Sequence, residues 1–76
     1  MSRPVKRSFT IGRHRTSISL ETAFWDALKV AAAHEKVPLA NLIARIDAKR
    51  GDGGLSSAVR TWLLDYYRNG KRPGDA

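Results

Sequence analysis

Residues 13–20 constrain this chain most, because their side chains follow the two-residue period of a β-strand and run directly into a helical pattern that starts at Glu21. Alternate side chains of a β-strand point to opposite faces. Ile18 and Leu20 therefore share one face, and the other face carries basic and hydroxyl side chains: Arg13, Arg15, Ser17 and Ser19. Guanidinium and hydroxyl groups of this kind contact base edges and phosphates in a DNA groove. A half-buried edge strand with one solvated face would show the same alternation.

The size of the chain limits the core that it can build. Its 76 residues form one domain, and a chain of this size buries only about 60% of the surface that it exposes when unfolded. The sequence contains no cysteine, so we expect neither a disulfide nor a thiolate–metal site. We therefore expect a second copy to complete the core as a homodimer, and we expect no metal and no other cofactor.

Positive charge is concentrated at the start of the chain. Lys and Arg outnumber Asp and Glu by 14 to 7. The first 20 residues contain no acidic residue and five basic ones, which are Arg3, Lys6, Arg7, Arg13 and Arg15. Such an arm suits a polyanion, since each neutralised phosphate releases condensed counterions, although a solubilising tail has the same composition. No apolar run is long enough to span a bilayer, so we expect a cytoplasmic protein without membrane association.

Gly12 marks a change in the parity of the alternation. The apolar residues Phe9 and Ile11 stand at odd positions before it, whereas Ile18 and Leu20 stand at even positions after it. A bulge, bend or turn at Gly12 explains the change, so the preceding residues either lengthen the strand beyond a kink or fold back as a hairpin. A strand without a partner in its own chain would pair with the same strand of a second subunit, which satisfies its backbone hydrogen bonds.

Three helices are predicted after the strand. Apolar side chains recur there at helical spacing, and the expected helices cover residues 21–35, 38–50 and 55–68, the last two separated by the glycine-rich segment 51–54. Ser56 or Ser57 is the expected cap of the last helix. We expect a flexible basic arm at residues 1–6, the folded domain at 7–69 and a loose tail at 70–76.

Two segments resemble a known family. They are Arg15-Thr16-Ser17-Ile18-Ser19-Leu20 before a helix, and later Gly54-Leu55-Ser56-Ser57-Ala58-Val59. Over roughly residues 7–68 the chain resembles the ribbon-helix-helix family of Arc/MetJ-type DNA-binding proteins, and within it a small bacterial subfamily. The resemblance implies a mainly α fold with one short strand, which pairs antiparallel with its copy in a second subunit and is followed by three helices.

The resemblance also implies roles for particular residues. The base-contacting residues would be Arg15, Ser17 and Ser19. The phosphate-contacting residues would be Arg13 and His14 at the end of the ribbon, and Leu55, Ser56 and Ser57 at the amino end of the family's second helix, where backbone amides bind an anion. The charge of the arm adds Arg3, Lys6 and Arg7 to the predicted phosphate contacts. The dimer core would contain Ile18, Leu20, Phe24, Trp25, Leu28, Val59, Trp62 and Leu63.

The helix at residues 38–50 departs from the usual family pattern, in which a single helix follows the first one. Either this helix is an insertion and residues 55–68 form the family's second helix, or residues 38–50 are the second helix and the last one is an appendage. We favour the insertion, because Gly54-Leu55-Ser56-Ser57 is more similar to the family motif than Val37-Pro38-Leu39-Ala40.

The sequence argues against an enzyme. His34-Glu35 is not followed by a second histidine at the spacing of a zinc-binding helix, and the carboxylates are scattered singly. Residues 51–54 lack the Lys-Ser/Thr that follows a phosphate-binding loop. We therefore expect a homodimer that binds double-stranded DNA sequence-specifically in the major groove, as a bacterial transcriptional regulator or repressor. The alternatives are an antitoxin-like module that also holds a protein partner, and a non-specific architectural nucleic-acid-binding protein.

Overall fold

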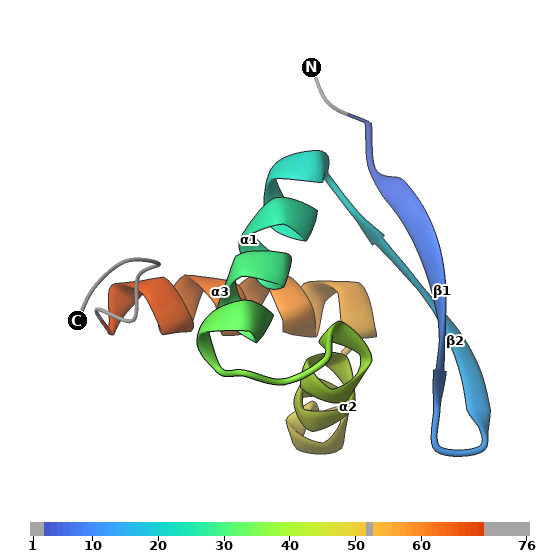
Figure 1. Cartoon of the computed structure of the whole chain (residues 1–76). Helices are drawn as coiled ribbons and strands as arrows, with labels where there is room; N and C mark the ends of the chain where they lie inside the picture. The colour runs from blue at the N-terminus through green and yellow to red at the C-terminus, as the bar shows by residue number, and fades with distance from the viewer. Residues whose placement is uncertain (1–2, 52, 70–76) are drawn as a thin grey trace.

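A two-stranded hairpin lies against three helices in the computed structural model, which describes residues 3–51 and 53–69 (Figure 1). The elements, in chain order, are β1 (Val5–Ile11), β2 (His14–Leu20), α1 (Thr22–His34), α2 (Leu39–Lys49) and α3 (Leu55–Arg68). β1 packs against α2, and β2 packs against α1 and α3. Val5 and Lys6 of the expected arm lie in β1, and the expected tail at 70–76 lies outside the described residues.

β2 pairs with β1 of its own chain, and the prediction that it pairs with its copy in a second subunit is therefore wrong. The antiparallel register runs from Val5↔Leu20 to Ile11↔His14. Gly12 has a φ of +61°, whereas Arg13 has no positive φ, which is the pattern of a type II′ hairpin turn. Because this two-residue turn has the twist that a hairpin needs, the strand finds its partner locally. Because the chain folds back here, the apolar residues change from odd positions before Gly12 to even positions after it.

The hydrophobic core is closed within one chain. Ile18 and Leu20 of β2 are fully buried, and Trp25, Leu42 and Val59 of the three helices are 2% exposed or less. Of the residues predicted for a dimer core, all except Phe24 and Trp62 are buried in this single chain. These side chains are therefore buried without a second copy, and their contribution to a dimer stays a prediction.

Lys36 ends α1 in a left-handed turn. The N–H of Lys36 donates to the carbonyl of Ala33 at 3.1 Å, and the N–H of Val37 donates to the carbonyl of Ala32 at 3.0 Å. These two bonds form a Schellman motif. Lys36 has a φ of +59°, a conformation that costs an L-residue with a Cβ about 1–2 kcal/mol.

We expect Lys36→Gly to raise the free energy of unfolding by about 0.5–1 kcal/mol, because glycine relieves this strain and loses only part of the gain through its greater unfolded-state entropy. Urea denaturation measures the change. The matched control is Lys29→Gly in the exposed middle of α1, where glycine should lower the free energy of unfolding by about 1 kcal/mol. Equal losses from both substitutions would show that Lys36 is not strained.

Tyr66 of α3 ties the end of α1 to the last helix. Its hydroxyl lies 2.7 Å from Nδ1 of His34 and donates to Oε2 of Glu35 at 3.1 Å. Burial, followed by the bond to the Glu35 carboxylate and its negative charge, raises the pKa of Tyr66 to about 12. The phenol is therefore held in its neutral form in the folded protein.

This raised pKa predicts a loss of stability in alkali. An unfolded tyrosine ionises near pH 10, whereas folded Tyr66 stays protonated up to about pH 12. Its contribution is therefore fully present below pH 10 and is lost as the pH rises towards and through 12. Urea denaturation at pH 9 and pH 11 measures the fall, and Tyr66→Phe should remove this part of it. An unchanged pH dependence in Tyr66→Phe would contradict the assignment.

Candidate nucleic-acid interface

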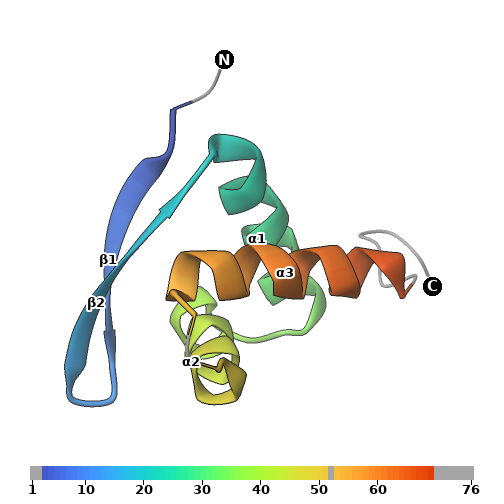
Figure 2. The same ribbon diagram turned by 180° about the vertical axis from the view of Figure 1, so that it is seen from behind.

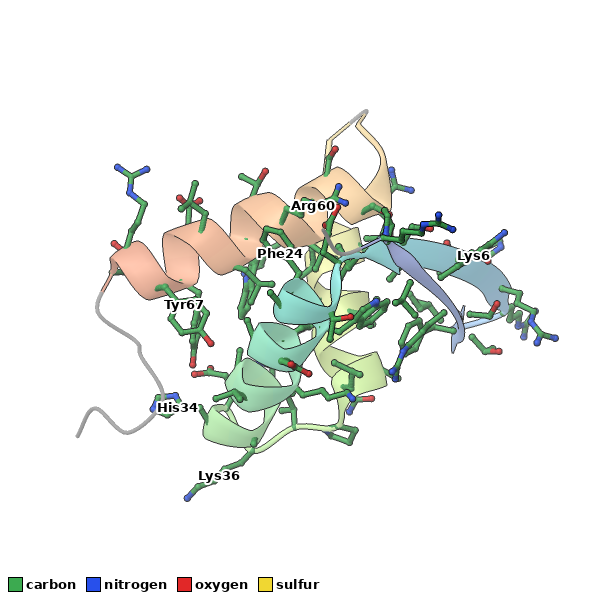
Figure 3. All side chains as sticks on the ribbon, turned by 90° about the horizontal axis from the view of Figure 1, so that it is seen from above. Lys6, Phe24, His34, Lys36, Arg60 and Tyr67 are labelled. Carbon is green, nitrogen blue, oxygen red and sulfur yellow. The ribbon has the colours of Figure 1, made fainter. Side chains whose placement is uncertain are left out.

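The hairpin presents one entirely polar face, which we call the polar ribbon face. The register pairs Lys6 with Ser19, Ser8 with Ser17 and Thr10 with Arg15, so the face consists of Lys6, Ser8, Thr10, Arg15, Ser17 and Ser19. All of these side chains are exposed except that of Ser19, which is half-buried. The hydroxyls of Ser8 and Ser17 lie 3.4 Å apart across the two strands. Lys6 extends from the ribbon away from the helices (Figure 3).

The opposite face of the ribbon turns towards the helices. It contains the buried side chains of Ile18 and Leu20, with Phe9 stacked on the Trp25 ring at a centroid distance of 5.8 Å. The indole N–H of Trp25 donates to the carbonyl of Val5 at 2.9 Å. The alternation of the two strands therefore separates a hydrophobic face from the polar ribbon face, and the helices fix which of the two is presented to a ligand.

The structure brings the three predicted base-contacting residues, Arg15, Ser17 and Ser19, onto this polar ribbon face. The predicted phosphate-contacting residues are more dispersed. Arg13 lies in the turn between β1 and β2 and therefore does not belong to the polar ribbon face. Arg7 lies on the opposite face, with its guanidinium carbon 5.2 Å from the centre of the Trp25 ring, and exposed His14 follows the same parity.

Ser8 and Thr10 belong to the polar ribbon face and were not predicted from the sequence. Their alternation with Phe9 and Ile11 was visible, but it does not show which other residues share their face. That follows only from the two-residue turn, which pairs Ser8 with Ser17 and Thr10 with Arg15. Glycine at the first position of a two-residue turn was the sequence signal that favours a hairpin over a kinked strand.

Arg60 of α3 fastens the end of β2 and was also missed. Its guanidinium donates to the carbonyl of Ser19 at 3.4 Å and to Oε1 of Glu21 at 3.0 Å. It lies over the ring of Phe24, with the guanidinium carbon 5.7 Å from the ring centre (Figure 3). A backbone hydrogen bond of Glu21 itself, and then Arg60, lower the pKa of the Glu21 carboxyl. The ion pair therefore holds the strand-to-helix junction against α3.

The amino end of α3 lies beside the ribbon, and the helix runs away from it (Figures 1 and 2). The hydroxyl of Ser56 accepts a hydrogen bond from the N–H of Ser19 at 3.1 Å. The cap residue is Gly54, and no side chain caps the helix, so the prediction that Ser56 or Ser57 is the cap is wrong. The amides of the first helical turn have no intrahelical acceptor, and this arrangement can bind an anion next to the ribbon.

None of the helices within the described ranges has the length and apolar character needed to cross a membrane. No group of His, Asp and Glu side chains in the same part of the chain is placed to hold a metal ion.

A two-stranded ribbon with a polar outer face, backed by packed helices, defines a class of β-ribbon nucleic-acid-binding domains. The sequence matches the ribbon-helix-helix domain family over residues 4–67, and the chain belongs to this family. The resemblance inferred from the two sequence segments is thereby confirmed. Comparison with curated proteins and with solved structures gave no match. Membership places the chain among DNA-binding regulators in general, in a family that is not enzymatic.

Proposed function

We propose that this chain is a transcriptional regulator that binds double-stranded DNA sequence-specifically through its polar ribbon face. The major groove of B-DNA admits a two-stranded β-ribbon, and the hairpin supplies both strands from one chain. Arginine pairs with the O6 and N7 atoms of guanine, and hydroxyls serve as donors or acceptors to several bases. Exposed Arg15 and Ser17 have these groups on the face that points away from the helices.

Phosphate contacts on either side of the ribbon would position it. Arg3 precedes β1, Arg13 lies in the turn and His14 follows it, and all three are exposed. The backbone amides of Leu55, Ser56 and Ser57 begin α3, which is fixed to β2 through the bond between Ser56 and Ser19. This link supports α3, rather than the inserted α2, as the counterpart of the family's second helix.

We further propose that two copies associate through α1 and α3. An apolar groove of about 260 Å³ lies between these helices and is lined by Ala23, Phe24, Ala27, Leu63, Leu64 and Tyr67. The side chain of Leu64 is 56% exposed. Burial of this apolar surface against a second copy would remove it from water and stabilise the dimer. A twofold dimer joined at this groove would present two ribbons and would favour a palindromic DNA site.

Leu64→Glu is therefore expected to convert a dimer into a folded monomer, because burying a charged carboxylate against the apolar groove costs free energy that burying leucine does not. Light scattering after size exclusion measures the mass, and circular dichroism checks the fold. Thr61→Glu, on an exposed position of the same helix, is the matched control and should leave the dimer intact. A wild-type chain that stays monomeric at high concentration would reject this interface.

Selection from randomised duplexes at several salt concentrations tests the proposed function. Enrichment of a short motif, with affinity that falls as salt rises, is the expected result, because base contacts specify and phosphate contacts release counterions. Salt-sensitive binding without an enriched motif would replace sequence-specific regulation with an architectural role. No binding at low salt would reject DNA binding and leave a protein-interaction module.

A further inference from the structure

The inserted helix α2 forms a groove with α3 that the proposed DNA contacts do not use. Two adjoining cavities of about 390 and 290 Å³ share Lys49, Trp62 and Asp65 in their walls. One cavity extends under the segment between the two helices, past Gly53 and Ser57, and the other extends along α3 towards Tyr66. Together they have the size of a site for a small molecule.

An aromatic stack forms the wall of the groove on the α3 side. Trp62 is partly buried and lines both cavities, so part of its indole is open to the groove. It stacks on Tyr66 with ring centroids 4.8 Å apart and planes inclined by 21°. Tyr66 is itself held by His34 and Glu35 through its hydroxyl. The stack therefore offers a fixed surface on which another ring can lie.

Charged side chains of both signs surround this stack. Arg45 and Lys49 lie one turn apart on α2 and are exposed. Neither takes part in the ion pairs among the described residues. Arg50 differs, because it is paired with Asp47 at 2.5 Å and donates to the carbonyl of Gly53 at 2.7 Å. Asp65 of α3 provides a carboxylate in the opposite wall.

We propose that this groove binds an aromatic amino acid. The ring would lie on Trp62, the carboxylate would bind Arg45 and Lys49, and the ammonium group would face Asp65. Each ligand group meets a group of complementary chemistry, whereas a purely apolar molecule would form no charge-assisted hydrogen bond with Arg45 or Lys49, and a doubly anionic molecule would place a negative charge beside Asp65. The site is formed by the helix that departs from the usual family pattern, and it is independent of the DNA-binding proposal.

Two-dimensional ¹H–¹⁵N NMR of the full chain without DNA tests the site. Titration with L-phenylalanine is expected to shift the indole N–H signal of Trp62 and the amide signals of Lys49 and Asp65. Each of three analogues should bind at least about tenfold more weakly: 3-phenylpropionate lacks the ammonium group, phenethylamine lacks the carboxylate, and L-leucine lacks the aromatic ring. Equal binding of any analogue, or no shift with L-phenylalanine, would overturn the proposal.

Substitutions then locate the bound carboxylate. Arg45→Gln and Lys49→Gln are exposed changes that preserve the fold, and each should weaken L-phenylalanine binding about tenfold. Lys29→Gln removes an equally exposed cation from α1 and should change nothing. If the two α2 variants bind as well as the wild type, the groove is not the site. Because no DNA is present, this failure is distinct from a failure of DNA binding.

Discussion

Ile18→Lys is expected to abolish cooperative folding. Ile18 is 0% exposed, and no acidic side chain lies among the buried residues around it, so the ammonium group would be buried without a partner. Burying an unpaired charge belongs to the short list of changes that cost more than about 4 kcal/mol. A chain of this length is stabilised by only roughly 4–11 kcal/mol in total. Circular dichroism during thermal unfolding measures the loss.

Ser17→Lys is the matched control for this substitution. Ser17 is the preceding residue of β2 but lies on the polar ribbon face and is exposed. Its variant should therefore unfold within about 0.5 kcal/mol of the wild type, as surface substitutions usually do. If both variants unfold alike, β2 is not held in the register described, because a shift of one residue exchanges the two faces.

Arg15→Ala is expected to lower affinity for the selected DNA site by about 1–3 kcal/mol and to relax base preference at one position. Arg15 is exposed on the polar ribbon face, opposite Thr10 in the register, where its guanidinium can pair with one base. Affinity for unrelated duplexes should fall far less. Quantitative binding to the selected site and to single-base variants of it measures both effects.

Arg13→Ala is the control that separates base readout from phosphate attraction. Arg13 carries the same charge but lies in the turn, so its loss should weaken all duplexes about equally and reduce the salt slope by about 1. Equal and sequence-independent losses from Arg13→Ala and Arg15→Ala would remove the polar ribbon face from base recognition.

The helices could be predicted because their apolar spacing is local information. The expected helices at residues 21–35, 38–50 and 55–68 differ by only a residue or so at each end from α1, α2 and α3. The polar and apolar faces of β2 were equally visible, because alternation requires no knowledge of the partner strand.

The partner of β2 could not be predicted in the same way. Pairing within the chain and pairing between subunits satisfy the same backbone groups, and the choice depends on whether Gly12 adopts a positive φ. Because the pairing was predicted wrongly, Ser8 and Thr10 were not assigned to the polar ribbon face, since only the register shows which face they share. Arg60 was missed for a related reason, because its partners Ser19 and Glu21 are about forty residues distant along the chain.

The two edges of the ribbon explain how a small protein can expose a β-hairpin without polymerising through it. An unpaired strand edge is a template for further strands, and natural proteins protect it with charges, prolines or covering elements. Here α3 covers the end of the free edge of β2. The hydroxyl of Ser56 accepts a hydrogen bond from the N–H of Ser19, and the guanidinium of Arg60 donates to the carbonyl of Ser19. The β1 edge follows Pro4 and carries the charge of Lys6. Lys6 and Ser56, two of the predicted phosphate contacts, thus also lie where they protect the free strand edges against pairing with another chain.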